Sequence, residues 1–116
     1  MNQLLLGAFL PFAAAAAVYV CRGFRAGLVS LTVTPVAMLL TSLWAVVPDL
    51  PRIAGRQDLY LRLAHDPRMD LFLWHYSIDR MEVDSPWYAA GVAVLFAALL
   101  LAAWRELQRV EQEEEA

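Results

Sequence analysis

Three long stretches of this chain contain no charged residue, and they limit its possible folds more than any other feature. No Asp, Glu, Lys or Arg occurs in residues 1–21, 26–48 or 85–104, which are 21, 23 and 20 residues long. An α-helix needs roughly 20 apolar residues to cross the hydrocarbon core of a bilayer. We therefore predict an all-α integral membrane protein built as a three-helix bundle.

The overall composition indicates the same class of protein. Hydrophobic residues make up 60% of the chain and charged residues 18%, against about 45–50% and about 25% in soluble domains. The net charge is −3, and four of the last six residues are Glu. Nucleic-acid binding requires a clustered basic surface, so nucleic acid is not expected as a partner. The single cysteine, Cys21, excludes an intrachain disulfide and a multi-cysteine metal site.

The ends of the three predicted helices follow from capping and helix-breaking residues. We expect transmembrane helices at about 3–20, 26–47 and 86–104, followed by an acidic tail, 105–116, that continues as a helix to about 113. Pro11 and Pro35 lie inside the first two helices, which membrane helices tolerate. The first stretch lacks a preceding basic region, which favours a retained helix; the alternative is a cleaved signal peptide, with a cleavage site in the alanine run 13–17.

Prolines and a serine mark where the second helix should end and where the third should begin. Pro48 and Pro51 should end the second helix, and Ser85 followed by Pro86 should begin the third.

The Arg22/Arg25 turn should be cytoplasmic, which places the N-terminus and residues 49–84 outside and the tail inside. Because the chain is short, lysine-free and carries no other targeting signal, a bacterial inner membrane is the default location.

Residues 49–84 are too long for a structureless connection, and we expect them to form a helical cap. One helix is predicted at about 57–64. A second begins at Asp66-Pro67, an N-cap followed by a first-turn proline, and runs to about residue 83. This second helix is too short and too charged to span a bilayer, so it should lie at the membrane surface or re-enter against the bundle.

The second cap helix contains the residues best suited to chemistry. On a helix with 100° per residue, Arg68, His75, Asp79 and Glu82 fall on one face, and two further candidates, His65 and Asp49, could converge on them. An imidazole with several carboxylates suits a divalent metal such as zinc, manganese or iron, or a general base. The same residues could instead form a structural network of hydrogen bonds and ion pairs.

Two short motifs in this region resemble a bacterial family of small membrane-bound metal-dependent hydrolase-like proteins. That family ends a membrane helix with Pro-Asp-Leu-Asp, and a later motif ends in Thr-His-Ser. Here residues 47–50 read Val-Pro-Asp-Leu, and residues 74–77 read Trp-His-Tyr-Ser. The sequence departs from the first motif at Pro51, where a second Asp is expected, and at Arg52, where a His is expected. It matches the second motif only at His75 and Ser77, and no His-Arg-Gly precedes His75. The resemblance implies a metal-dependent hydrolase site at Asp49 and His75.

Two functions are therefore open at this point. The first is a non-catalytic subunit or accessory protein of a membrane complex, whose partners are the lipid bilayer and other membrane subunits or a second copy of the chain. The second is a hydrolase at the membrane surface, in which His75, Asp79 and Asp49, with His65 nearby, hold a zinc or manganese ion. In that hypothesis Glu82 activates the metal-bound water, and Arg68 holds an anionic group of the substrate.

A transport function is disfavoured, because no charged residue lies at mid-membrane depth. The polar residues of the second helix are instead expected to bond to the backbone or to neighbouring helices. They are Thr32, Thr34, Thr41 and Ser42. Alanines that recur every fourth residue, as at Ala89, Ala93 and Ala97, favour close contacts between helices.

Overall fold

The computed structural model describes residues 2–81 and 85–116, and every regular element in these residues is helical. The elements are α1 (Asn2–Cys21), α2 (Leu28–Val46), the 3-10 helix η1 (Val47–Asp49), α3 (Leu50–Ile53), α4 (Gln57–Leu63), the 3-10 helix η2 (Pro67–Leu71), α5 (His75–Asp79) and α6 (Trp87–Glu115). Three helical segments are long and apolar enough to cross a membrane, namely Gln3–Cys21, Leu28–Ile53 and Trp87–Glu115. The prediction of an all-α chain with three such helices is confirmed for this part of the chain.

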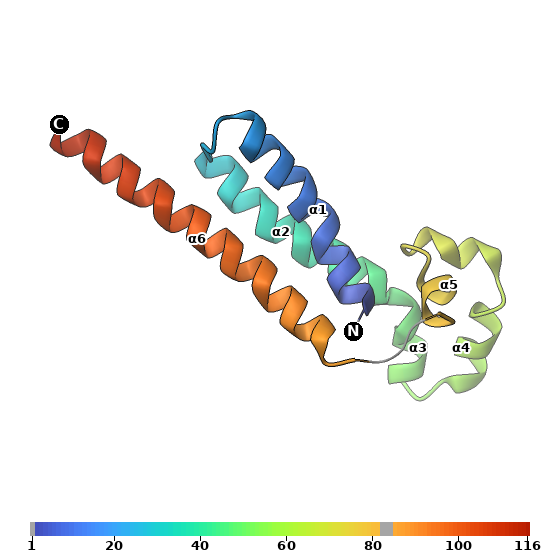
Figure 1. Cartoon of the computed structure of the whole chain (residues 1–116). Coiled ribbons are helices and arrows are strands. Elements are labelled where there is room, and N and C mark those ends of the chain that lie inside the picture. The colour runs from blue at the N-terminus through green and yellow to red at the C-terminus, as the bar shows by residue number, and fades with distance from the viewer. Residues whose placement is uncertain (1, 82–84) are drawn as a thin grey trace.

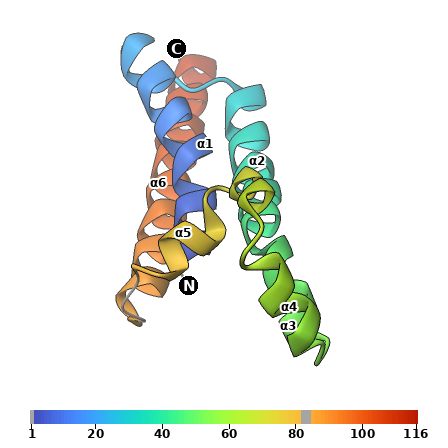
Figure 2. The ribbon, with the colours of Figure 1, turned by 90° about the vertical axis from the view of Figure 1, so that its right-hand side faces the viewer.

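The long helices lie side by side, and the short ones gather at one end (Figures 1 and 2). Helices α1 and α2 form an antiparallel pair, and α6 runs beside them in the same direction as α1. The N-terminus and the cap, which we define as residues 49–81, lie at one end of the bundle. The turn 22–27 and the C-terminus lie toward the other end, which gives the molecule an elongated shape of 65 × 26 × 23 Å.

Helices α1 and α2 lie in close backbone contact at Gly7. A Cβ atom added to Gly7 would lie 2.6 Å from the Cα of Ser42 and 2.6 Å from the carbonyl oxygen of Thr41. The Thr41 hydroxyl donates to the Gly7 carbonyl, and the Ser42 hydroxyl donates to the Leu4 carbonyl at 3.0 Å. Such small-residue contacts, reinforced by hydroxyl hydrogen bonds, are typical of helix packing in membranes.

The polar residues of α2 behave as the sequence predicts. Thr32 and Thr34 donate to backbone carbonyls one turn earlier in their own helix, at 2.9 and 2.7 Å. Thr41 and Ser42 bond across to α1, as described above. Pro11 lies within α1 and Pro35 within α2 without ending either helix, as expected.

Helix α2 ends at Val46, close to the predicted end before Pro48, but short helical turns continue the chain beyond it. The chain passes from α2 through η1 into α3, and each proline stands at the first or second position of its short helix. A proline is tolerated there because the first N–H groups of a helix need no partner within it. The helical path therefore continues to Ile53 and carries Asp49 on the way.

The first cap helix, α4, matches its prediction, but the single helix predicted over 67–83 does not form. Asp66 caps η2 as expected, since its side chain accepts the Arg68 N–H at 2.9 Å. The helix then breaks at Leu73 and Trp74, whose φ angles of 55° and 53° are left-handed. The chain resumes as α5, and residues 82–84 lie outside the described residues.

The third long helix follows its prediction closely. Helix α6 begins at Trp87, and the Ser85 hydroxyl accepts the Trp87 N–H at 3.3 Å. The helix continues without interruption through the polar segment to Glu115. It meets α1 where Gly91 faces the side chain of Leu5.

Candidate functional site

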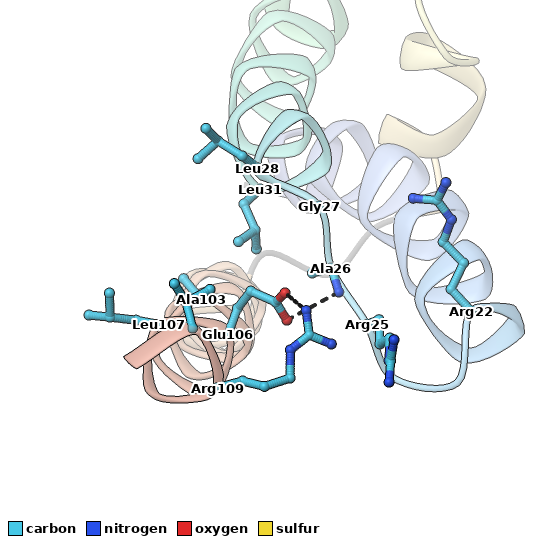
Figure 3. Close-up of a pocket in the computed structure, with 11 residues that line it drawn as sticks. Arg22, Arg25, Ala26, Gly27, Leu28, Leu31, Ala103, Glu106, Leu107 and Arg109 are labelled. Carbon is cyan, nitrogen blue, oxygen red and sulfur yellow. Dashed lines mark hydrogen bonds and ion pairs between the residues drawn. The ribbon is translucent and has the colours of Figure 1, made fainter. Parts of the chain in front are cut away.

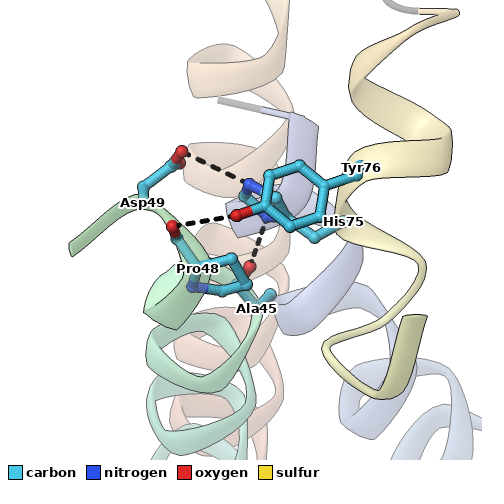
Figure 4. Close-up of polar contacts among 5 residues, drawn as sticks. All are labelled: Ala45, Pro48, Asp49, His75 and Tyr76. Atoms are coloured by element: carbon cyan, nitrogen blue, oxygen red, sulfur yellow. Dashed lines mark hydrogen bonds and ion pairs between the residues drawn. The ribbon is translucent and has the colours of Figure 1, made fainter. Parts of the chain in front are cut away.

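His75 is the first residue of α5, and its side chain is completely buried against the end of α2. Its Nδ1 atom lies 2.8 Å from the Ala45 carbonyl oxygen (Figure 4). Carbonyls in the last turn of a helix lose their regular partners, and Pro48, three residues further on, has no N–H to offer. Because a carbonyl can only accept, Nδ1 is the donor in this contact.

The other ring nitrogen of His75 faces a carboxylate. Its Nε2 atom lies 3.3 Å from Asp49 Oδ1, and the Asp49 side chain is 30% exposed. With Nδ1 already protonated, a neutral ring would direct the Nε2 lone pair at the carboxylate, which is repulsive. The contact is favourable when a proton or a metal cation lies between Nε2 and Oδ1.

Tyr76 extends the same contact between the cap and α2. Its hydroxyl donates to the Pro48 carbonyl at 3.3 Å, as Figure 4 shows. Its ring packs edge-on against Tyr60 of α4, with 5.6 Å between the ring centroids. The guanidinium of Arg52 lies 5.8 Å from the Tyr60 ring centroid, within range of a cation–π interaction. Residues from α3, α4 and α5 are thereby gathered around the end of α2.

The break at residues 72–74 is what brings His75 to this position. Trp44 of α2 packs against Phe72, with ring centroids 4.8 Å apart, and its Nε1 donates to the Leu71 carbonyl at 3.3 Å. Two left-handed residues then reverse the chain before α5 begins. Left-handed non-glycine residues cost about 1–2 kcal/mol each, so the contacts of Trp44 and His75 must offset that cost.

The structure brings together two of the predicted site residues, His75 and Asp49. The other predicted residues either lie elsewhere or fall outside the part of the chain that the structure describes. His65 is exposed and its Nδ1 bonds to the Leu61 carbonyl at 2.8 Å. Arg68 is also exposed, and η2 and α5 are separate helices, so the predicted shared face with His75 does not exist. Asp79 ends α5, but its side chain is not described, and Glu82 lies outside the described residues.

The pair His75 and Asp49 fits part of a metal site. Two tetrahedral zinc ligands are about 3.4 Å apart when each lies about 2.1 Å from the metal, and the observed N–O separation is 3.3 Å. Metal-binding histidines usually donate the other ring nitrogen to a carbonyl or carboxylate, as Nδ1 does here. Among the described residues, however, no three His, Cys, Asp or Glu side chains are grouped closely enough to hold a metal ion.

Several residues of this site were not predicted from the sequence. Tyr76 and Tyr60 read as ordinary aromatic residues, and the accepting carbonyls of Ala45 and Pro48 have no side-chain signature. The adjacency of Tyr76 to His75 was the one available signal, since a buried tyrosine usually needs a partner for its hydroxyl.

Comparison of the chain with known protein families, with curated proteins and with solved structures found no match. The resemblance to the hydrolase-like family therefore depends on the residues around Asp49 and His75 alone.

Proposed function

We propose that this protein is a small integral membrane protein of the bacterial inner membrane that serves as a non-catalytic subunit or accessory protein of a membrane complex. The observation that supports this most is the outer face of α6. Ala89, Ala93 and Ala97 are all exposed, although they lie in a helix apolar enough to span a bilayer.

The alanine face of α6, defined as Ala89, Ala93 and Ala97, is exposed along its length, and only Ala89, at one end, lines a pocket shared with α1 and α2 among the described residues. At 100° per residue these alanines lie roughly opposite the side of α6 that carries Gly91, and Gly91 contacts Leu5 of α1. Small residues spaced by four let a second helix approach closely. A helix of another membrane subunit, or of a second copy of this chain, suits this face.

The site at the end of α2 serves this function as a structural fastening. His75 uses both ring nitrogens to hold α5 against α2, and Tyr76 adds a third polar contact. The cap is thereby held in one arrangement at the outer end of the bundle, where it can dock against an extramembrane part of the complex. In this orientation the turn 22–27 and the C-terminal end of α6 face the cytoplasm.

Site-specific photo-crosslinking in the native membrane tests the proposal. A photoreactive residue at Ala93 should give one discrete crosslinked product of higher mass. The same residue at Ala102, which lines a small cavity facing α1 and α2, is the matched control and should give no such product. The proposal fails if Ala93 crosslinks only to lipid and the purified chain is a fully stable monomer in mild detergent.

A second function, metal-dependent hydrolysis at the membrane surface, is favoured by the tetrahedral spacing between His75 Nε2 and Asp49 Oδ1. A divalent ion would supply Lewis-acid chemistry, and these two residues would hold it. Within the chain, the Ala45 carbonyl fixes the ring so that Nε2 faces Asp49. The ion's remaining positions would be filled by water or by groups beyond the described residues.

Elemental analysis of the detergent-purified protein decides this second function. Stoichiometric zinc or manganese should be present in the parent and absent from Asp49→Asn and His75→Gln. His65→Gln is the control, because His65 makes no hydrogen bond or ion pair with either residue in the described part of the chain, and it should retain the metal. A Glu82→Gln variant that keeps metal but loses hydrolysis would support the role predicted for Glu82. Parent protein without metal would exclude this function.

A further inference from the structure

A large pocket opens at the end of the bundle opposite the cap, between the turn 22–27 and α6 (Figure 3). Its volume is about 890 Å3, within the usual range for ligand sites. Three arginines and one glutamate line it, Arg22, Arg25, Arg109 and Glu106, which leaves a net charge of +2. The candidate site described above does not involve this region.

The walls of the pocket are apolar on the side toward the membrane-spanning segments. Leu28 and Leu31 of α2 face Leu107 and Val110 of α6. The pocket therefore combines a basic rim with a hydrocarbon wall, as a ligand with an anionic head and an apolar chain requires.

The pocket lies where the apolar part of the bundle ends. Helix α1 ends at Cys21, and α2 begins at Leu28. Tyr19 and Phe24 pack edge-on here, with ring centroids 5.7 Å apart, and Trp104 precedes the polar part of α6. Aromatic residues of this kind mark the level of the lipid headgroups.

The arginines retain unused capacity to bind an anion. Neither Arg22 nor Arg25 forms an ion pair within the described residues. Arg109 pairs with Glu106, but its Nε atom is buried without a hydrogen-bond partner, and the Glu113 carboxylate oxygen is 3.9 Å away. Figure 3 shows the Arg109 side chain between α6 and the turn, with Arg25 on the turn side.

Glu106 limits the positive charge of the pocket while it holds the turn in place. One of its oxygens accepts from Arg109, and the other accepts the Ala26 N–H at 3.4 Å. A glutamine at this position would keep an acceptor for Ala26 but remove the negative charge.

We propose that this pocket binds a bilayer lipid whose phosphodiester headgroup carries a net negative charge, the phosphate lying among Arg22, Arg25 and Arg109 and one acyl chain on the leucine wall. The inference rests on the membrane insertion included in the proposed function. A phosphate can accept two parallel hydrogen bonds from one guanidinium, which explains why arginine suits this site.

Native mass spectrometry of the intact chain in detergent, with added phosphatidylglycerol or phosphatidylcholine of the same chain length, tests the proposal. Phosphatidylglycerol should bind at least about ten-fold more tightly. Each basic residue near an anionic phosphate contributes about 1 kcal/mol, a five-fold change in affinity. Arg109→Gln should therefore weaken binding about five-fold and Arg22→Gln/Arg25→Gln about 25-fold, whereas Glu106→Gln should strengthen it.

Arg105→Gln is the matched control, because Arg105 is exposed at the same end of α6 but does not line the pocket. It should change affinity less than two-fold. Equal binding of the two lipids, or equal losses from Arg105→Gln and Arg109→Gln, would overturn the proposal. Displacement of the lipid by millimolar inorganic phosphate would overturn its lipid assignment in favour of a free-phosphate site.

Alkaline carbonate extraction of membranes separates a failure of this inference from a failure of the proposed function. A chain extracted by carbonate is not inserted, and both proposals fall. A chain that stays in the membrane yet shows no lipid preference removes only the lipid site. Far-ultraviolet circular dichroism of each variant confirms that any loss of binding occurs in a folded protein.

Discussion

At the scale of single residues, His75 is the most constrained side chain in the molecule. It is completely buried, and a buried polar group is tolerated only when its hydrogen bonds are satisfied. Ala45 and Asp49 satisfy both ring nitrogens. The same two contacts join segments about 30 residues apart in the sequence, so one side chain largely determines where α5 lies.

Replacing His75 with alanine should loosen the cap without unfolding the three long helices. The change creates a cavity and leaves a buried carbonyl without a donor, which costs about 2–4 kcal/mol. Hydrogen exchange should show faster exchange at α5 amides and unchanged exchange in α1. His65→Ala is the control and should change little, since His65 is exposed. Unchanged protection of α5 in His75→Ala would contradict the fastening role.

Removing the Tyr76 hydroxyl should have a smaller effect of the same kind. Tyr76→Phe keeps the ring contact with Tyr60 but loses the hydrogen bond to Pro48, which costs about 1 kcal/mol. Hydrogen exchange in α5 measures it. The control is Tyr88→Phe, because the Tyr88 hydroxyl makes no hydrogen bond within the described part of the chain, and its effect should be near zero. Equal effects from the two substitutions would show that the Pro48 contact contributes nothing.

At the scale of elements, the long helices and the first cap helix, α4, could be predicted from the sequence, whereas the fold of the cap after η2 could not. A long stretch without charged residues is enough to predict a membrane-spanning helix. Helices α1, α2 and α6 therefore appear near their predicted positions. The break between η2 and α5 depends on contacts of Trp44 and His75 with partners distant in sequence, and these outweigh local helix preference. The pairing of His75 with Asp49 was anticipated, whereas the shared helical face with Arg68 required a helix that does not form.

The left-handed break should respond to the residue at Trp74. Asparagine tolerates a positive φ, whereas a β-branched residue is strained there. Trp74 is 59% exposed, so both substitutions remove similar packing. Trp74→Ile should therefore lower the stability of α5 by about 1 kcal/mol relative to Trp74→Asn, as measured by hydrogen exchange. The opposite order would show that the break does not persist in solution.

The close contact between α1 and α2 should require a residue without a side chain at position 7, where the chain has Gly7. Gly7→Ala places a methyl group against the backbone of Ser42, which forces the helices apart and costs about 1–3 kcal/mol. Thermal unfolding in detergent should show a lower midpoint. Gly91→Ala is the control, since its methyl group meets only the flexible side chain of Leu5 at 3.0 Å. A midpoint as high in Gly7→Ala as in Gly91→Ala would contradict the close crossing.

At the scale of the whole molecule, the helix directions divide the arginines between two ends. Arg22 and Arg25 line one pocket with Arg109 of α6, one turn after Arg105, and the cap lies at the opposite end of the bundle from the turn 22–27. Two groups of arginines on one side agree with a cytoplasmic location for that end. The cap has arginines of its own, so the assignment of sides remains a prediction.

The single cysteine provides a direct test of orientation. Cys21 is exposed and lies at the turn 22–27. A membrane-impermeant maleimide should fail to label it in intact cells and should label it after the membrane is opened. Cys21→Ser combined with Ser85→Cys moves the thiol to the cap end and should be labelled from outside. Labelling of Cys21 in intact cells would reverse the predicted orientation.

The length of α6 determines how far its arginines and its final glutamates lie from the membrane surface. Its 29 residues extend about 43 Å, and the part after Trp104 accounts for about 16 Å of this at 1.5 Å per residue. If the bilayer surface lies near Trp104, the final glutamates stand beyond the screening distance of about 8 Å at physiological salt. The helix thus acts as a rigid spacer: the arginines lie within the electric field of the lipid surface, and Glu114 and Glu115 are held too far away to repel that surface. Glu113 alone of the final glutamates forms an ion pair with Arg109 in the described residues.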